Sequence, residues 1–394
     1  MNAEQHVPQF RFKDFSDSWE QRSFKTLYKK VIEKNDLSFE SDRIISVANM
    51  YYKPNDSKSD EKYMETYNIF RLGDIAFEGN KSKNFAYGRF VENTIGDGIV
   101  SHVFDVFRPI SEYDLNYWKY FIHYEDIMGQ KLRMSTTKAT MMNNLVSKDF
   151  LKQSVLVPNL DEQQKIGTFF KQLDHLITLH QRKLAKLKEL KKGYLQKLFP
   201  QNSEKVPEFR FKGYSDAWEK RKLGELAEFI NGRAYKQDEL LASGKYPVLR
   251  VGNFYTNDKW YYSNLELPEK YYAEEGDLLY TWSATFGPHI WIGPKVIYHY
   301  HIWKVALKNI FEKDFALQFF EADRVRLLNS TNGSTMIHVT KKDMESKGIL
   351  LPDVYEQRTI GDLLKRVDHL IAATQCKLDL LKKLKKGYLQ KMFC

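Results

Sequence analysis

The sequence predicts an α+β protein in which two similar mixed α/β domains are joined and spaced by two long helices packed as an antiparallel coiled coil. Three observations lead to this fold class. Two segments of the chain occur twice, and one of them has the heptad spacing of a long helix. The regions between the repeats mix short apolar runs with Gly, Asn and Asp, as expected of short strands and turns.

The two repeated segments form a frame that is used twice. Residues 7–27 return as 206–226 with 12 of 21 positions identical, and residues 156–199 return as 350–393 with 25 of 44 identical. The regions between these segments look almost unrelated. A shared frame around two different centres suggests one task performed twice on two different targets.

Each copy divides into a domain and a long helix. The expected order is a first domain over 1–157, a central helix over 158–200, a second domain over 201–351 and a C-terminal helix over 352–394. A chain of 394 residues is long enough for two or three domains. Its content of 42% hydrophobic and 14% aromatic residues is typical of a folded protein.

The composition argues against membrane, secreted and metal-binding proteins. No stretch of 18 apolar residues is present, so no membrane span is expected. The N-terminus lacks a charged-then-apolar signal pattern, which predicts a cytoplasmic protein. Only Cys376 and Cys394 are present, and neither has a metal-ligand neighbour at the usual spacing, so no metal site is expected.

The net charge of +10 is concentrated in the repeated helical segments. Residues 161–199 and 355–393 each hold nine basic and four acidic residues, so these two segments carry the whole excess. A basic balance indicates a nucleic acid partner. The two centres are charge-balanced, so a DNA contact there requires local patches.

Both long helices have a start signal. Asn159 can cap the first backbone N–H groups, and Glu162, three residues later, can reach back toward the cap. Asp353 and Glu356 supply the same chemistry in the second copy. About forty residues at 1.5 Å each make a rod of roughly 60 Å.

Apolar residues then follow at the alternating spacing of a coiled-coil seam. The two seams consist of Ile166, Phe170, Leu173, Ile177, Leu184, Leu187, Tyr194 and Leu198, and of Ile360, Leu364, Val367, Ile371, Leu378, Leu381, Tyr388 and Met392. Lys191 and Lys385 interrupt them at equivalent positions. Gly193 and Gly387 either end the regular helix early or sit in a partner groove. The lysine-rich face is either solvated or meets DNA phosphate or an acidic partner.

The two centres share landmarks that predict one common scaffold. Gly73-Asp74 and Gly276-Asp277 each precede an apolar run, as in a turn that leads into a strand. The loops that follow differ completely, at 78–84 and 281–287. Variable loops on a rigid scaffold are typical of binding sites that differ in specificity.

Motifs of known active sites are absent from the sequence. It has no glycine-rich nucleotide-binding motif and no Asn/Asp-Pro-Pro-Tyr/Phe signature of an adenine methyltransferase. An Asp-His pair is repeated at Asp174-His175 and Asp368-His369, but its place in an amphipathic helix favours packing and hydrogen bonding. No catalytic residue is therefore expected.

Both long helices open with the pattern Pro-x-x-x-Glu-Gln-x-x-Ile-Gly, followed by an Asp. The two copies consist of Pro158, Glu162, Gln163, Ile166, Gly167 and Asp174, and of Pro352, Glu356, Gln357, Ile360, Gly361 and Asp368. Together with the Val-Pro-x-Phe-Arg-Phe segment that opens each copy, this arrangement resembles the specificity subunit of type I restriction–modification systems. The resemblance covers essentially the whole chain.

The resemblance implies a non-catalytic subunit with two target-recognition domains, each reading one half of a bipartite, asymmetric DNA site through the major groove. It implies that the helices fix the separation of the domains and dock two methyltransferase subunits, which carry S-adenosylmethionine. A restriction/translocase subunit that uses ATP and Mg would then join. No cofactor is expected in this chain itself.

Candidate DNA contacts are inferred from loop position and side-chain chemistry. Arg and Lys can read guanine edges, Asn can pair with adenine, and Ser or Thr can contact either a base or phosphate. The candidates of the first domain are Lys81, Ser82, Lys83, Asn84, Tyr87, Arg89, Thr137, Lys138, Asn143 and Asn144. Those of the second are Asn231, Arg233, Tyr235, Lys236, Ser283, Thr285, His289, Asn332, Ser334 and Thr335.

The first four seam residues of each helix are the candidate partner-binding residues. They are Ile166, Phe170, Leu173, Ile177, Ile360, Leu364, Val367 and Ile371. Which face of the helices binds the methyltransferase subunits, and which face binds the other helix, is left open by the sequence.

Two other classes of function compete with this interpretation. One is a coiled-coil scaffold that joins two protein-binding domains without DNA, and the other is an enzyme with an unrecognised active site. Salt-dependent DNA binding by the assembled complex would favour the specificity subunit over the scaffold. Turnover by the isolated chain would favour the enzyme.

Overall fold

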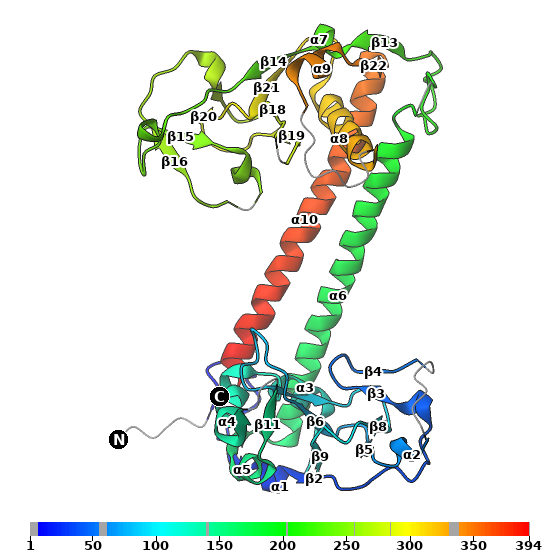
Figure 1. The fold of residues 1–394 in the computed structure, drawn as a ribbon, viewed down its shortest axis with the longest axis vertical. Coiled ribbons are helices and arrows are strands. Elements are labelled where there is room, and N and C mark those ends of the chain that lie inside the picture. Colours follow the sequence, from blue (N-terminus) through cyan, green and yellow to red (C-terminus); the bar gives the residue numbers. More distant parts are fainter. Residues whose placement is uncertain are drawn as a thin grey trace. The chain divides into compact units, whose positions relative to one another are not determined.

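The computed structural model describes residues 7–54, 61–138, 142–201, 204–255, 257–283, 285–330 and 339–393. The chain forms two compact units (Figure 1). The first comprises residues 1–181 and 377–394, and the second comprises residues 182–376. These units cut across the predicted helical segments, because each one contains part of both long helices, α6 (Leu160–Lys197) and α10 (Val354–Met392).

The first unit is built around a four-stranded antiparallel sheet with strand order β2-β9-β6-β7. These strands are β2 (Tyr28–Lys30), β9 (Val106–Pro109), β6 (Ile75–Glu78) and β7 (Arg89–Glu92). Smaller two-stranded sheets are formed by β1 (Glu20–Ser23) with β12 (Ser154–Val157), β3 (Ile45–Ser46) with β4 (Tyr51–Tyr52), β5 (Asn68–Phe70) with β8 (Gly98–Val100), and β10 (Thr136–Lys138) with β11 (Asn143–Leu145). The short helices are α1 (Phe24–Leu27), α2 (Glu61–Met64), α3 (Leu115–Phe121), α4 (Glu125–Ser135), α5 (Ser147–Lys152) and the 3₁₀ turn η1 (Ser41–Arg43).

The second unit repeats this central sheet. Its order, β14-β21-β18-β19, matches that of the first unit strand for strand. These strands are β14 (Ala227–Asn231), β21 (Ile302–Leu307), β18 (Leu278–Thr281) and β19 (Gly287–Ile290). The frame pair is β13 (Glu219–Lys222) with β22 (Gly348–Leu351), and a further sheet consists of β16 (Tyr261–Ser263), β15 (Tyr246–Leu249), β20 (Val296–Tyr298) and β17 (Tyr272–Ala273). The helical segments are α7 (Leu223–Leu226), α8 (Lys313–Ser330), α9 (Lys341–Ser346), η2 (Gln237–Glu239), η3 (Val251–Phe254) and η4 (Glu269–Tyr271). The predicted α+β class and the shared scaffold of the two centres are confirmed.

A salt bridge closes the repeated frame in each unit. Arg11 donates two hydrogen bonds to the carboxylate of Glu162, both at 2.7 Å. Arg210 does the same to Glu356, both at 2.8 Å. Asn159 caps α6 as predicted, because its side-chain oxygen accepts a hydrogen bond from the backbone N–H of Glu162 at 2.9 Å. The Glu162 side chain does not reach back to the cap, because Arg11 and the indole N–H of Trp19 occupy its oxygens.

The glycine of the frame motif allows close packing on the long helices. A Cβ atom at Gly167 would lie 2.6 Å from the backbone nitrogen of Tyr117, at the start of α3. A Cβ atom at Gly361 would lie 2.9 Å from the backbone nitrogen of Phe315, near the start of α8. Since real Cβ contacts are never this short, the two positions require glycine for the same steric reason.

The two long helices pack against each other with opposite chain directions. In the first unit, Phe169 of α6 contacts Tyr388 of α10 with ring centroids 5.0 Å apart. Further along α6 and further back on α10, Asp174 pairs with Lys385 at 2.6 Å. The second unit contains the reciprocal pair, Lys191 of α6 with Asp368 of α10, also at 2.6 Å. The lysines that interrupt the seams are therefore neutralised by the aspartates of the frame motif.

Gly193 and Gly387 lie inside α6 and α10, respectively. A Cβ atom at either position would meet no heavy atom of the chain within 4 Å. Neither glycine ends its helix early, and neither sits in a groove of this chain.

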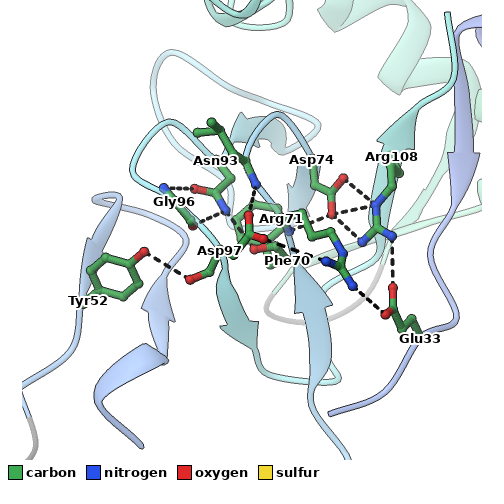
Figure 2. Close-up of polar contacts among 10 residues, drawn as sticks. Glu33, Tyr52, Phe70, Arg71, Asp74, Asn93, Gly96, Asp97 and Arg108 are labelled. Atoms are coloured by element: carbon green, nitrogen blue, oxygen red, sulfur yellow. Dashed lines mark hydrogen bonds and ion pairs between the residues drawn. The ribbon is translucent and has the colours of Figure 1, made fainter. Parts of the chain in front are cut away.

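The Gly-Asp landmarks occupy equivalent turns. Gly73 and Gly276 both have a φ of 87°, in the left-handed region that favours glycine. Figure 2 shows how the first turn is held: Arg108 and the backbone N–H of Arg71 donate to Asp74, and Arg108 also pairs with Glu33. Burial raises the pKa of Asp74 despite these donors.

In the second unit, Asp277 accepts a hydrogen bond from the backbone N–H of Glu274 at 2.8 Å and pairs with Lys304 at 2.7 Å. The partner of the aspartate differs between the copies, but its role in fixing the turn is the same. The strand that leaves each turn, β6 or β18, is fully buried, so the loop beyond it has a rigid base.

Candidate nucleic-acid interface

The structure brings the two candidate patches of the first domain together. They lie on the loop between β6 and β7 and on the β10–β11 hairpin. The backbone N–H of Asn143 donates to the carbonyl of Gly79 at 2.8 Å, and its side-chain amide donates to the carbonyl of Ala86 at 3.2 Å. The result is one continuous surface, called surface 1 here, whose exposed members are Lys81, Ser82, Lys83, Asn84, Thr137, Lys138 and Asn144.

Three of the predicted DNA contacts in surface 1 are held within the unit by contacts of their own. Asn143 is 3% exposed and holds the loop to the hairpin, so its amide is not available to a base. Arg89 is tied to Glu78 at 2.6 Å and to the carbonyl of Ala48 at 3.0 Å. Tyr87 is half-buried against the core of the unit. These side chains shape the surface, and the exposed lysines and amides supply its chemistry.

The first patch of the second domain is rigid. Arg233 forms two hydrogen bonds with Glu239, at 2.9 and 2.7 Å, and its guanidinium lies 5.1 Å from the ring centroid of Tyr235. The hydrogen bonds from Arg233 lower the pKa of Glu239 to about 2. Asn231 and Lys236, at the two ends of this loop, are exposed. Arg233 is therefore one half of an ion pair and not a free cation.

The second patch is centred on His289. Its ring stacks on Phe254 with centroids 4.1 Å apart, and its Nε2 lies 3.3 Å from the hydroxyl of Tyr255. Burial lowers the pKa of His289 to about 4, so the imidazole is neutral at pH 7. Thr285 is exposed and Ser283 is half-exposed at the preceding turn. The third predicted patch, Asn332, Ser334 and Thr335, lies outside the described residues.

An aromatic cluster that is not among the sequence-predicted contacts connects these two patches. The backbone N–H of Tyr300 donates to the carbonyl of Arg233 at 3.0 Å, and that of Trp282 donates to the carbonyl of His301 at 3.2 Å. The rings of Tyr300 and His301 have centroids 3.9 Å apart, and Trp282 lies 5.0 Å from His301. The run Tyr-His-Tyr-His at 298–301 was the available sequence signal. The connected set is called surface 2: Asn231, Arg233, Tyr235, Lys236, Tyr255, Trp282, Ser283, Thr285, His289, His299, Tyr300 and His301.

Comparison with known proteins decides the family. Residues 7–189 and 215–383 match the family described as the type I restriction modification DNA specificity domain. The match covers most of the chain and includes both copies of the frame. The chain belongs to this family. It is the DNA specificity subunit of a type I restriction–modification system, which is a non-catalytic kind of subunit.

Curated relatives agree with this assignment. The specificity subunit of the type I restriction enzyme MjaVIII from Methanocaldococcus jannaschii is 23% identical over 290 residues, which cover 68% of this chain and 67% of that protein. A putative MjaX specificity subunit from the same organism is 25% identical over 70% of this chain and 64% of its own length. The specificity subunit of EcoBI from Escherichia coli is 21% identical over 44% of this chain and 37% of its own length.

Solved structures share the fold. The S subunit of a type I system from M. genitalium superposes with a TM-score of 0.59 at 15% identity and covers 98% of this chain and 99% of that one. A chain from a structure concerned with complex assembly and conformational transition of a type I system gives a TM-score of 0.56 at 16% identity, with 95% and 97% covered. At these identities, the likeness concerns the fold alone.

The predicted partner-binding residues of this specificity subunit lie in its own interior. Ile166 and Phe170 belong to the core of the first unit, and Ile360 and Leu364 to that of the second. Leu173, Ile177 and Val367 are also buried, and Ile371 is half-buried. Since these side chains pack within the chain, a partner subunit can reach the helices only through their exposed faces.

Exposed leucines on those faces recur in both copies. Leu176 and Leu370 occupy equivalent positions and are 44% and 50% exposed. Leu190 and Leu384 form the second equivalent pair, at 45% and 41%. All four have the heptad position that directly flanks the seam. The heptad pattern did not single them out, because they lie beside the seam and not in it.

The described residues contain neither a metal-ligand cluster nor a membrane-spanning helix. No group of three His, Cys, Asp or Glu side chains in that part of the chain could hold a metal ion. No helix there is long and apolar enough to cross a membrane.

Proposed function

We propose that surfaces 1 and 2 each read one half of a bipartite, asymmetric DNA site. The observation that carries this proposal is the contrast between frame and loops. The central sheets have the same strand order and the frames are closed by equivalent salt bridges, whereas the exposed loops differ completely. Two different half-sites require two domains that share a fold but differ in their exposed side chains.

The chemistry of the two surfaces suits different readout. Surface 1 offers Lys81 and Lys83 for phosphates or guanine edges and Asn84 and Asn144 for adenine. Surface 2 offers aromatic rings, half-exposed hydroxyls and the Arg233–Glu239 pair. An exposed aromatic or methyl-bearing surface favours contact with the thymine methyl group.

We also propose that the helices dock two methyltransferase subunits and set the spacer between the half-sites. The repeated leucines support two identical docking sites. The first unit presents Leu176 with Leu384, and the second unit presents Leu370 with Leu190. Exposed apolar side chains at equivalent positions are expected to bury the same partner surface twice. S-adenosylmethionine would then enter with the partner, and a restriction/translocase subunit with ATP and Mg would complete the assembly.

The docking proposal is tested by counting methyltransferase subunits in purified complexes. Leu176→Glu with Leu384→Glu is expected to reduce the complex from two methyltransferase copies to one. Leu370→Glu with Leu190→Glu is expected to do the same. The matched control is Leu179→Glu with Leu380→Glu. These leucines are similarly exposed, but the other copy has Ala373 and Lys186 at the equivalent positions, so they do not recur. Two bound copies in all three variants would refute the docking sites.

DNA reading is tested by the salt dependence of binding to a cognate duplex. Lys81→Ala and Lys83→Ala are each expected to lower the slope of log affinity against log salt by about 1 if the lysine contacts phosphate. Lys29→Ala and Lys148→Ala, at exposed lysines of the same unit that lie on β2 and α5 and are not members of surface 1, are expected to leave it unchanged. Equal slopes in all four variants would remove surface 1 from the interface.

A further inference from the structure

The second unit contains a cavity beneath its frame sheet that the proposed DNA interface does not use. Its volume is about 920 Å³, within the range of about 300 to 1,000 Å³ common for ligand pockets. The wall is formed by the segment after α6, by the β13–β22 pair and by α8. Its floor is apolar, with Trp218, Phe319 and Ile349 among the lining residues.

The wall of this cavity carries an excess of positive charge, with five cations against the three carboxylates of Glu219, Glu225 and Asp323. The Glu225 carboxylate accepts a hydrogen bond from the backbone N–H of Lys222. Two of its cations are neutralised, since Arg221 pairs with Glu219 at 2.8 Å and Lys347 pairs with Asp323 at 2.5 Å. The other three are Lys205, Lys220 and Arg326, and none of them has an acidic partner within 4 Å among the described residues. Unpaired cations that converge on one cavity attract an anion.

Arg326 is the deepest of these cations. Its guanidinium donates to the carbonyl of Pro200 at 3.0 Å, which leaves other N–H groups free for a ligand. Burial lowers the pKa of Arg326, and only Asp323 offsets this effect. An anion bound in the cavity would offset the cost of burying the charged guanidinium. Lys220 is held as well, because its stem lies against Gly348, where a Cβ atom would come within 3.0 Å of it.

Two polar atoms of the wall lack hydrogen-bond partners. They are the indole Nε1 of Trp218, a donor, and the Oδ2 of Asp323, an acceptor, both buried. A buried donor without a partner is rare in folded proteins and calls for an explanation such as an anionic ligand, whereas the Asp323 carboxylate pairs with Lys347 and does not itself bind an anion. In the first unit, the equivalent indole of Trp19 donates to Glu162 at 3.1 Å.

The frame positions around the cavity also differ in charge between the copies. Lys220 and Lys347 replace Gln21 and Gln153, although the surrounding segments are otherwise similar. The backbone contact at Gln153 and Lys347 is the same in both units. The carbonyl of Gln153 accepts the N–H of Phe24, and the carbonyl of Lys347 accepts the N–H of Leu223, both at 2.9 Å. The two cations are therefore additions to a common framework, found only in the second unit.

From these observations we infer that the cavity bounded by Trp218, Lys220 and Arg326 binds a phosphate-bearing ligand. The cations hold the phosphate, and the apolar floor accommodates an attached ring system such as that of a nucleotide. The same phosphate chemistry is available from a free nucleotide and from a DNA backbone. This inference does not depend on DNA reading by surfaces 1 and 2.

The test compares ligands and variants by thermal unfolding of the full chain. Inorganic phosphate, adenosine triphosphate, adenosine and sodium chloride are compared at equal ionic strength. Phosphate and the triphosphate are expected to raise the melting temperature in a concentration-dependent manner, as a ligand of the native state does, whereas adenosine and chloride are not. The apparent affinity is expected to fall by about tenfold or more in Lys205→Gln/Lys220→Gln, which changes exposed side chains and keeps the fold.

A charge-matched control removes two lysines from the first unit, Lys29→Gln/Lys148→Gln, and is expected to respond as the wild type does. Arg326→Gln is expected to abolish the response. A short duplex forms the second arm: if only duplex binding weakens in Lys205→Gln/Lys220→Gln relative to the control, the ligand is backbone phosphate. If chloride protects as well as phosphate, or if the variant and the control behave alike in both arms, the inference is wrong.

Discussion

At the scale of single residues, the repeated frame motif is explained by structural demands. Glu162 and Glu356 each close the frame through an arginine, and Gly167 and Gly361 admit a backbone that a side chain would block. Each of these residues is needed twice because each unit is closed in the same way. The motif therefore identifies the family without being part of surfaces 1 and 2, the proposed DNA-reading surfaces.

One residue of the first unit has a clear pH signature. Both carboxylate oxygens of Glu92, at the end of β7, are buried without a hydrogen-bond partner, and burial raises its pKa to about 10. Because this pKa lies above that of the unfolded chain, the contribution of Glu92 to stability is fully present below about pH 4 and is lost as the pH rises.

Glu92→Gln is expected to stabilise the protein at neutral pH. The carboxylate is ionised in the unfolded chain and must take up a proton, or bear a buried charge, on folding, whereas the amide does neither. The gain should be about 3 kcal/mol at pH 7 and about 1 kcal/mol at pH 5. Urea unfolding at several pH values measures it, with the exposed Glu65→Gln as control. A gain that does not change with pH would show that Glu92 is already paired or solvated.

The candidate DNA contacts could be predicted from the sequence only in part. Lys81, Lys83 and Asn84 are exposed, as the polar loop sequence indicated. Asn143 and Arg89 have the same side-chain chemistry as a base-reading residue, but they hold loops together. Sequence chemistry cannot distinguish an amide that reads a base from one that closes a turn, because the difference lies in long-range contacts.

At the scale of elements, the heptad pattern predicted both long helices and their mutual packing. It did not predict the reciprocal ion pairs, Asp174 with Lys385 and Lys191 with Asp368, which require the register between the helices. The two pairs occupy equivalent places in the two units. A lysine at a seam position is costly unless it finds a carboxylate, so these pairs help to fix the register.

Reversing one ion pair tests its role. Lys385→Asp is expected to destabilise the first unit by about 1 to 3 kcal/mol, since it places a second negative charge beside Asp174. Adding Asp174→Lys should restore part of the loss, so that a double-mutant cycle in urea gives a positive coupling energy. The neighbouring exposed Lys386→Asp is the control and should change stability by less than about 0.5 kcal/mol. Strict additivity of the two substitutions would mean that the pair does not contribute.

At the scale of the whole molecule, the repeat predicted two domains of one design, and the equal strand order of the central sheets confirms it. The second sheet of each unit was not predicted, because its strands are only two to four residues long. In the second unit it is the four-stranded sheet β16-β15-β20-β17, and in the first unit its counterparts are the β3–β4 and β5–β8 pairs, linked by a parallel bridge between Ile44 and Ile99. The assignment of 1–157 and 201–351 as separate recognition domains remains a prediction about function.

The helices are expected to act as a ruler for the recognised DNA. Inserting four residues, about one helical turn, between Lys186 and Glu189 adds about 6 Å to α6. Duplex DNA advances about 34 Å per ten base pairs, so the spacer should lengthen by about one or two base pairs while both half-sites stay unchanged. Sequencing of methylated sites in cells that express the variant gives the spacer directly. An active variant with an unchanged spacer would show that another contact sets the separation.

The central claim is that each unit reads its own half-site, and one measurement addresses it most directly. Residues 28–155 are replaced by the corresponding region of another specificity subunit, and the methylated sequences are determined genome-wide in cells that express the exchange variant with its methyltransferase subunit. One half of the recognised sequence should change, while the other half and the spacer stay as they were. A change in both halves, or in neither, would contradict the independent reading of two half-sites by two units.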